Sequence, residues 1–390
     1  MGFLDRLKSK RKRAFVLGID GTPHTLIKRL LQRGDMPNLA GLVSEGSLVR
    51  YNSTLPWVSS VAWSTYMTGV NAGKHGIYGF VERHPDTYKT FIPTSRQMQS
   101  ETLWEYLATR GKRVVVMNVP GTYPPRKVNG VLVSGFLAPS LEKATYPPDI
   151  AQQLKAFGYR IDADPWLAYQ DKAKLLDELD LTLAHRAEAM FHLMQHQEWD
   201  FFQCHIMETD RLHHFLWEEM VEEHPTLAPR FYAFFHQLDQ VIGELRSRLD
   251  DGTELMLLSD HGFCALQQEV YVNHWLAQQG WLTFEADEPK SLQDISPKTV
   301  AYSLDPGRIY INLRGREGKG SVSPGQEYES LRNEIAEAAL QLTDPESGQR
   351  MFQADHKRED LYHGPCFDAA QDLVLQPVDD FDPKGAIYKP

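Results

Sequence analysis

Acidic side chains and histidines follow three hydrophobic, strand-like segments of the chain. Asp20, Asp210 and Asp260 each stand within a few residues of the end of such a segment. His214 lies four residues after Asp210, and His261 directly follows Asp260. Because functional groups in open α/β sheets collect at the carboxyl ends of the strands, we expect these five side chains to meet at one edge. Carboxylate oxygens and imidazole nitrogens together bind zinc and related divalent metals, so the sequence predicts a metal site.

Each part of this pattern also has a simpler explanation. A single Asp at a strand end is often a helix cap, and the Asp-His-Gly at residues 260–262 also fits a turn. One Asp-x-x-x-His pair is expected by chance, although one helical turn would put Asp210 and His214 on the same face. His213 is out of phase with Asp210 and is expected to face solvent or to lie behind a ligand. Three acids at the ends of three strands, two with a histidine, favour the metal site over caps and turns.

A serine-rich segment precedes a helix that we expect to start after Ser59 and to end at Gly69. Ser59 would then lie at the helix N-terminus, where free N–H groups and the helix dipole favour an anion. It is either a simple N-cap or a nucleophile whose alkoxide a metal and the helix end stabilise.

Strand-like and helical segments alternate along the chain and would position these residues. The predicted strands are Ala14–Ile19, Arg113–Val119, Gly130–Ser134, Asp200–Met207, Glu254–Leu258 and Asp372–Leu375. The predicted helices are His24–Ser44, Thr102–Arg110, Lys172–Gln197, Arg230–Leu249 and Tyr328–Leu342. This alternation predicts an α/β fold with a mainly parallel central sheet flanked by helices.

Two stretches interrupt the alternation, at about residues 138–170 and 263–326. Both are rich in Pro, Gly or aromatic residues, and the second contains a short strand-like run at Arg308–Leu313. We interpret them as insertions that form a cap at one end of the sheet. No linker divides the chain cleanly, so we expect one elaborated domain over residues 14–390, after a basic tail at residues 1–13.

The charge distribution limits the classes of partner. The chain of 390 residues has a net charge of −11, although residues 1–13 hold six basic side chains and one Asp. So acidic a body makes binding of duplex nucleic acid unexpected. The chain has three widely spaced cysteines and no CxxC pair, which fits a reducing compartment. We expect a cytoplasmic protein, in which residues 1–13 are either a solvated tail or a weak contact to a membrane surface.

Several motifs together resemble the alkaline phosphatase superfamily, in the branch of type I phosphodiesterases and nucleotide pyrophosphatases. The matching pieces are "VLGIDG" with Asp20, the serine segment leading into "TGVNAGKHGIYGF", "METDRLHHFLW" with Asp210 and His214, and "LSDHG". Their order and separations match, and "VNHWL" and "IYINLRGREG" extend the resemblance through nearly the whole chain.

The resemblance implies two divalent metal ions, usually zinc, although Asp and His ligands also accept manganese or iron. Carried over to this chain, Asp20, Asp260 and His261 would bind one ion, which would also hold the oxygen of Ser59. The other ion would be bound by Asp210, His214 and a third ligand. The family often has Thr at the nucleophile position, and a shift by one residue to Ser60 stays open.

The third ligand of the second ion is a departure from the family pattern. The family has a His in a Gly-x-His motif beyond the strand that reads "DLVLQPV" here, and no His follows that strand in this chain. His356 and His363 precede it, in a polar stretch. We expect that the segment with the third His lies beyond Pro390, so that the domain is C-terminally incomplete, and His363 is the alternative ligand.

The function implied by the resemblance is metal-dependent hydrolysis of phosphodiester or nucleotide pyrophosphate bonds through a phosphoseryl intermediate. A phosphomonoesterase or phosphonate hydrolase on the same scaffold is the nearest alternative. A non-catalytic binding or scaffold protein with a degenerate second metal site is the alternative from another class. The expected substrate is a small phosphate ester, and the sequence leaves the oligomeric state open.

Overall fold

The computed structural model describes residues 12–387, which form two compact units. Unit 1 contains residues 12–53 and 101–263, and unit 2 contains residues 54–100 and 264–387. The predicted basic tail lies outside the described residues, except for Lys12 and Arg13, and Arg13 begins the first strand. Within this range, no helix combines the length and the apolar character that crossing a membrane requires. The predicted domain and insertion boundaries stay predictions.

Unit 1 is built on a six-stranded sheet with the order β6-β5-β4-β7-β1-β8. The strands are β1 (Arg13–Ile19), β4 (Val114–Met117), β5 (Gly130–Val133), β6 (Thr145–Tyr146), β7 (Phe201–Ile206) and β8 (Thr253–Leu258). All neighbouring pairs are parallel except β5 with the edge strand β6. The predicted mainly parallel sheet is therefore confirmed, and five of the predicted strands belong to it.

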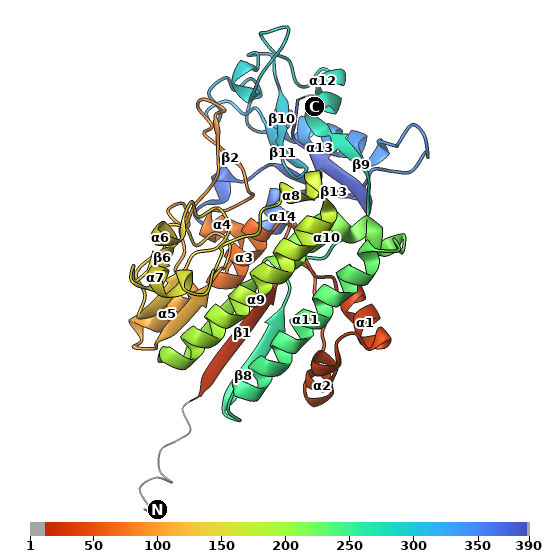
Figure 1. Cartoon of the computed structure of the whole chain (residues 1–390). Helices are drawn as coiled ribbons and strands as arrows, with labels where there is room; N and C mark the ends of the chain where they lie inside the picture. The colour runs from red at the N-terminus through yellow and green to blue at the C-terminus, as the bar shows by residue number, and fades with distance from the viewer. Residues whose placement is uncertain (1–11, 388–390) are drawn as a thin grey trace, which may run out of the picture. The chain divides into compact units, whose positions relative to one another are not determined.

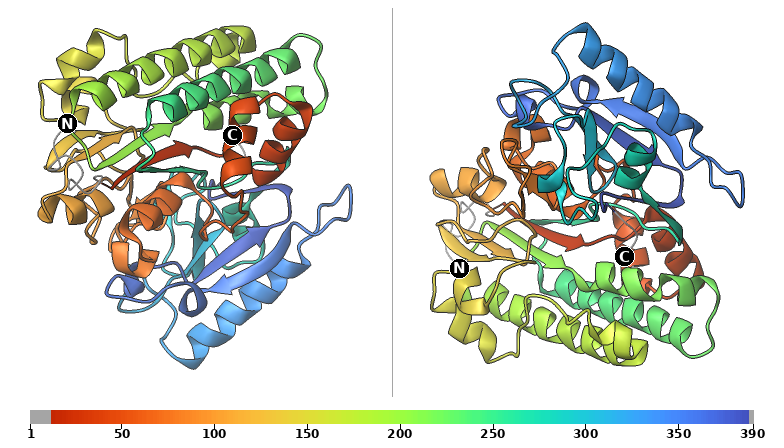
Figure 2. Two further views of the ribbon diagram at one scale, coloured as in Figure 1. Left: turned by 90° about the horizontal axis from the view of Figure 1, so that it is seen from below. Right: turned by 90° about the horizontal axis from the view of Figure 1, so that it is seen from above.

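Long helices cover this sheet. The helices of unit 1 are α1 (His24–Arg33), α2 (Pro37–Glu45), α5 (Leu103–Thr109), α6 (Leu141–Ala144), α7 (Ile150–Lys155), α8 (Leu167–Gln170), α9 (Lys172–His196), α10 (Glu208–Val221) and α11 (Leu227–Arg248). Helices α9 and α11 lie side by side along one face of the sheet, as Figures 1 and 2 show. The helix predicted at residues 24–44 is divided into α1 and α2, because Gly34 adopts a left-handed φ of 78° that ends α1 and Pro37 begins α2.

Unit 2 contains a second, antiparallel sheet with the order β10-β11-β13-β12. Its strands are β10 (Ala301–Leu304), β11 (Arg308–Ile311), β12 (Phe352–Lys357) and β13 (Leu373–Pro377), and two smaller sheets pair β2 (Glu82–Arg83) with β3 (Thr90–Phe91) and β9 (Leu266–Tyr271) with β14 (Asp380–Lys384). Its helices are α3 (Ser59–Thr68), α4 (Ala72–His75), α12 (Val272–Gln278), α13 (Gln326–Gln341) and α14 (Arg358–Leu361), with 3₁₀ turns η2 (Leu292–Asp294) and η3 (Phe367–Ala369). The strand predicted at Asp372–Leu375 therefore exists as β13 but belongs to this antiparallel sheet, because a short apolar run does not specify its pairing partner.

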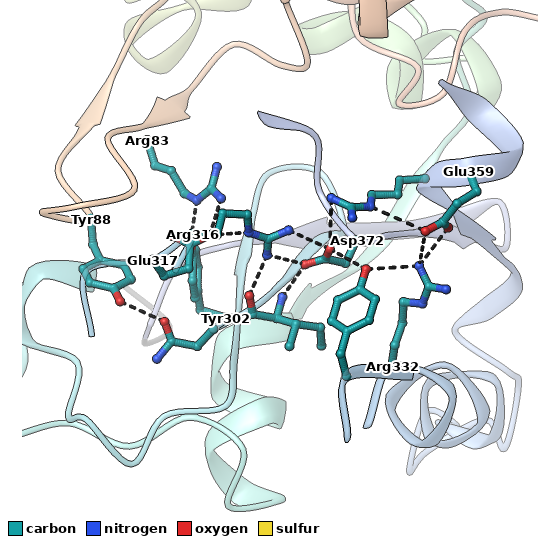
Figure 3. A network of polar contacts seen from close by, with 12 residues as sticks. Arg83, Tyr88, Tyr302, Arg316, Glu317, Arg332, Glu359 and Asp372 are labelled. Carbon is teal, nitrogen blue, oxygen red and sulfur yellow. Dashed lines mark hydrogen bonds and ion pairs between the residues drawn. The ribbon is translucent and has the colours of Figure 1, made fainter. Parts of the chain in front are cut away.

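Buried charges in unit 2 compensate one another. Asp372, just before β13, accepts two hydrogen bonds from Arg316, at 2.8 and 2.6 Å, and one from the hydroxyl of Tyr328 at 2.7 Å. Glu317 pairs with Arg83 and accepts from the Tyr302 hydroxyl at 2.9 Å. Figure 3 shows that these residues form one continuous network in the interior of the unit. Every carboxylate in that network is bonded to a guanidinium group, which is the arrangement that makes buried charges tolerable.

Candidate functional site

The sheet order places three of the predicted acidic residues at neighbouring strand ends. Strand β1 lies between β7 and β8, and Ile19 is in register with Ile206. Asp20 follows β1, Asp260 follows β8 after one intervening residue, and Asp210 lies in the first turn of α10 directly beyond β7. Because β7, β1 and β8 are adjacent and parallel, their carboxyl ends lie at the same edge of the sheet, as we predicted for these three residues.

Asp20, Asp260 and His261 form a compact cluster in which ligand atoms from all three lie within 4.8 Å of one another. The two carboxylates are buried, and only His261 is partly exposed. The backbone N–H of Gly21 donates to Asp260 Oδ1 at 3.1 Å. His261 Nδ1 lies 2.8 Å from the carbonyl of Gly262, which leaves Nε2 at 3.5 Å from Asp260 and 3.6 Å from Asp20. A backbone partner at one imidazole nitrogen is the usual way in which the other nitrogen is aimed at a metal.

The electrostatics of this cluster favour a cation. Burial, and then the charge of Asp20, raise the pKa of Asp260 to about 6. Burial lowers the pKa of His261, but the carboxylates of Asp260 and Asp20 outweigh it and raise this pKa to about 9. The negative charge of the two buried carboxylates thus favours the protonated form of His261. A divalent cation bound to the same three side chains would supply that positive charge in place of the proton.

The residues present fit one divalent metal ion. Zinc accepts carboxylate oxygens and imidazole nitrogens as ligands, so these three side chains can supply three of its ligands. Among the described residues, Asp260 Oδ2 is buried and makes no hydrogen bond, although the Nε2 of His261 lies nearby. A buried carboxylate oxygen is costly in that state, and a bound cation would satisfy it.

Gly21 gives the ligands room. Its backbone has a φ of +62°, which favours glycine. A Cβ atom at this position would lie 3.1 Å from Asp210 Oδ1 and 3.2 Å from His261 Cε1. The side-chain-free turn after Asp20 therefore lets both groups approach the same place.

Asp210 and His214 form the second predicted pair of ligands. Asp210 Oδ1 lies 3.4 Å from His214 Nε2 on one face of α10, as the four-residue spacing predicts. Burial raises the pKa of Asp210, but the hydrogen bond and charge of His214 outweigh it and lower the pKa overall. Asp210 is buried, while the His214 side chain is 53% exposed, so its imidazole can reach an ion or a substrate.

His213 lies in an aromatic core rather than at the surface or behind a ligand. It is fully buried among Trp217, Phe231, Phe235 and Phe263, with ring centroids 5.3 to 5.9 Å away. Burial lowers its pKa to about 3. The expectation from its helical phase was wrong because α11 and the segment after β8 also cover that side of α10.

The predicted nucleophile begins helix α3 in unit 2. Ser59 is the first residue of this helix, Val58 is its N-cap, and Gly69 ends it with a φ of 66°. The carbonyl of Val58 accepts from the backbone N–H groups of Val61 and Ala62, at 3.0 Å each. The first N–H groups of any helix have no intrahelical acceptor, which is why helix N-termini favour anions. Ser59 and Ser60 are both buried, and Ser60 Oγ has no hydrogen-bond partner among the described residues.

The two histidines considered for the second ion also belong to unit 2. His356 lies on β12, and its Nε2 is 2.9 Å from Gln376 Oε1. His363 follows α14 and is exposed, with its backbone N–H donating to Asn71 Oδ1 at 3.1 Å. Neither side chain is part of the metal-type cluster found among the described residues. The third ligand therefore stays a prediction.

Sequence reasoning missed two buried contacts of unit 1. His205, inside β7, lies with its Nε2 2.7 Å from Asp20 Oδ2, and burial lowers the pKa of this His to about 4. Arg186 of α9 makes a buried bidentate pair with Glu208, the first residue of α10, at 2.6 to 3.1 Å. A histidine inside a fully buried strand, which also contains the polar Gln203, was the available signal for His205.

Comparison with known proteins shows the family of this chain and the fold that it shares. The model of the type I phosphodiesterase/nucleotide pyrophosphatase family matches residues 14–390. The structure of phosphonoacetate hydrolase from Sinorhizobium meliloti 1021 is similar, with a TM-score of 0.65 and 15% identity, covering 96% of this chain and 83% of that chain. Murine ectonucleotide pyrophosphatase/phosphodiesterase 5 is also similar, with a TM-score of 0.54 and 13% identity over 97% of this chain and 82% of that one. No curated protein sequence matches the chain. At these identities the two structures show a shared fold, and the predicted alkaline phosphatase-like fold is confirmed.

Proposed function

The chain belongs to the type I phosphodiesterase/nucleotide pyrophosphatase family, and we propose that it hydrolyses small phosphodiesters or nucleotide pyrophosphates with two divalent metal ions. Membership confirms the predicted class of phosphoric ester hydrolase. The observation that carries the proposal is the buried cluster of Asp20, Asp260 and His261. Such a set of donors has little structural use without a cation, and it lies where α/β enzymes bind their ligands.

In this proposal Asp20, Asp260 and His261 hold one ion, and Asp210 and His214 contribute to the other. Zinc is the ion we favour, because mixed carboxylate and imidazole ligands suit it. Divalent ions at such positions neutralise charge on phosphoryl oxygens and lower the pKa of a hydroxyl group. Gly21 keeps the space between the two sets of ligands open.

Ser59 is the proposed nucleophile. Its Oγ attacks phosphorus, a new Oγ–P bond forms, and the P–O bond to the leaving group breaks with the electron pair on the leaving oxygen. The hydroxyl proton of Ser59 is lost as the bond forms, and the leaving alkoxide or phosphate takes up a proton from water. The first N–H groups of α3 stabilise the negative oxygens of the transition state. Water then attacks the phosphorus, the Oγ–P bond breaks, and a proton of that water restores the Ser59 hydroxyl. The product is the phosphomonoester that still carries the other ester group.

Phosphonate hydrolysis is a second candidate. It is supported by the similarity to phosphonoacetate hydrolase, whose TM-score of 0.65 exceeds the 0.54 found for the murine pyrophosphatase/phosphodiesterase. The substrate would then be a small phosphonate, with cleavage of a P–C rather than a P–O bond. Both candidates use the same proposed ligands and nucleophile.

A substrate panel with a matched pair of serine variants tests the proposal. The full chain is stripped of metal, reloaded with Zn²⁺ and assayed with bis(p-nitrophenyl) phosphate, the p-nitrophenyl ester of thymidine 5′-monophosphate, and phosphonoacetate. We expect zinc-dependent turnover, which Ser59→Ala lowers by at least about 1,000-fold while Ser60→Ala changes it much less. Turnover retained in Ser59→Ala, or no turnover of any substrate with zinc bound, contradicts the proposed reaction.

A further inference from the structure

A buried hydrogen bond joins a strand residue of unit 1 to one of the proposed ligands. His205 Nε2 lies 2.7 Å from Asp20 Oδ2, and both residues are fully buried. A carboxylate only accepts hydrogen bonds, so Nε2 carries the proton in this contact. The imidazole can donate from Nε2 in either of its charge states, and the contact therefore does not depend on the charge of His205.

The strand register explains why this contact forms. His205 on β7 is opposite Gly18 on β1, and Asp20 lies two residues beyond Gly18. Asp20 lies just past β1, but its N–H still bonds to the Ile206 carbonyl and so continues the ladder. Residues two apart point to the same face of a sheet, so the imidazole and the Asp20 carboxylate share a face. Gly18 has no side chain to stand between them.

Hydrogen bonds fix both the backbone of Asp20 and one oxygen of its carboxylate. The backbone is held on both sides, because its N–H donates to the Ile206 carbonyl at 3.1 Å and its carbonyl accepts from the Thr209 hydroxyl at 2.7 Å. His205 holds Oδ2, while Oδ1 faces the cluster, 3.6 Å from His261 Nε2. A carboxylate fixed at one oxygen presents the other in a single orientation.

We propose that His205 is a positioning residue that orients the Asp20 carboxylate so that Oδ1 is presented to the divalent cation. This inference rests on the proposed function, in which Asp20 binds that cation. Groups that hydrogen-bond to metal ligands typically change metal affinity by about 10- to 100-fold when they are removed. His205 would do so without entering the coordination sphere.

A pair of variants of equal length tests the hydrogen bond separately from side-chain size. His205→Gln places an amide N–H near the position of Nε2, whereas His205→Met has a similar length and no donor. The full chain is stripped of metal, and its dissociation constant for Zn²⁺ is measured by competition with a chromophoric chelator. Thermal unfolding of each metal-free variant is recorded beside it. His205→Asn, whose amide is too short to reach Asp20, is a third variant in case His205→Met does not fold.

We expect His205→Gln to bind zinc within about threefold of the wild type, and His205→Met and His205→Asn to bind it about 10- to 100-fold more weakly. Equal zinc affinity in all variants would overturn the positioning role and leave the proposed function standing. Equally weak binding by the Gln and Met variants would also overturn it, because the donor would then not be what matters. Absence of zinc binding in the wild type would instead contradict the proposed function itself.

Discussion

Asp260 in unit 1 and Asp372 in unit 2 are both buried carboxylates, yet their surroundings act on them in opposite directions. For Asp260, burial and the neighbouring charge of Asp20 raise the pKa to about 6. For Asp372, burial also raises the pKa, but the hydrogen bonds and charge of Arg316 outweigh it and the pKa is lowered. The ion-pair partner of Asp260 is a histidine, whereas Asp372 pairs with a bidentate Arg316 and with Arg358.

The difference separates a site that stabilises the fold from a site that binds a ligand. Arg316 donates to both oxygens of Asp372, and the Tyr328 hydroxyl and the Ile311 N–H donate to them as well, so this carboxylate is satisfied without a cation. Asp260 keeps one buried oxygen without a hydrogen bond among the described residues, and a second carboxylate stands beside it. Unit 2 thus has compensated charge in its interior (Figure 3), while unit 1 holds a charge imbalance that a cation would correct.

The largest expected effect comes from removing each carboxylate in turn. Asp372→Asn removes the buried carboxylate with which Arg316 and Arg358 pair, while Arg316 keeps its bond to Glu317. It should lower the free energy of unfolding by about 3 kcal/mol. Asp260→Asn relieves repulsion with Asp20, so the metal-free variant should be as stable as the wild type or up to about 2 kcal/mol more stable. Urea denaturation of the metal-free proteins measures both. Equal destabilisation by the two changes would remove the distinction between the sites.

The buried ion pair of Arg186 and Glu208 lies in unit 1 and sharpens the comparison. It shows whether the effect of a substitution depends on the charge being paired with an arginine or on the unit in which it lies. Arg186→Met leaves Glu208 buried without its arginine and should cost about 3 kcal/mol, near the low end for such pairs because the N-terminus of α10 also stabilises the charge. The double variant Arg186→Met/Glu208→Leu should lose clearly less than the sum of the two single changes in a urea-denaturation cycle. Additive losses would mean that the pair is not coupled.

Zinc should stabilise the protein through Asp260, and this stabilisation should not depend on the compensated pair of Arg186 and Glu208. Zinc at 100 times its dissociation constant should stabilise the wild type by about 2.7 kcal/mol. The same zinc concentration should stabilise Asp260→Asn by clearly less than it stabilises the wild type. It should stabilise Arg186→Met by as much as the wild type. Thermal unfolding with and without zinc checks this. Equal stabilisation of Asp260→Asn would place the ion elsewhere.

The smallest expected effect is a pH dependence of opposite sign at the two sites, of at most about 1.4 kcal/mol per pH unit for each group. The folded pKa of Asp372 lies below the unfolded value of about 3.9, so its contribution is present above that pH and is lost as the pH falls. The folded pKa of Asp260 is about 6, so its contribution to the metal-free protein is present below pH 3.9 and is lost as the pH rises to 6. Stability differences between the wild type and each Asn variant, followed from pH 3 to 7, should therefore run in opposite directions.

Much of unit 1 could be predicted from the sequence, because its signals are local. Runs rich in apolar residues predict β1, β7 and β8, and a four-residue spacing predicts Asp210 and His214 on one helix face. The hydrogen bond between His205 and Asp20 joins residues 185 positions apart in the chain and depends on the register between β1 and β7, which no local pattern reports.

Unit 2 was harder to predict for the same reason. The pairing of β13 in an antiparallel sheet depends on distant strands, and the buried partners of Asp372 come from three separate segments of the chain. The chain also enters unit 2 at residue 54, leaves it after residue 100 and returns at 264, without a linker of distinctive composition. Local sequence patterns predict individual helices and strands, whereas strand pairing and buried ion pairs depend on how these elements pack together.

The central claim is that Asp20, Asp260 and His261 bind a divalent cation. Crystals of the full chain grown with zinc and measured on both sides of the zinc absorption edge test it most directly. We predict an anomalous peak about 2.0–2.2 Å from a carboxylate oxygen of Asp20, a carboxylate oxygen of Asp260 and His261 Nε2. A zinc-loaded crystal with no anomalous peak among these three residues would contradict the account.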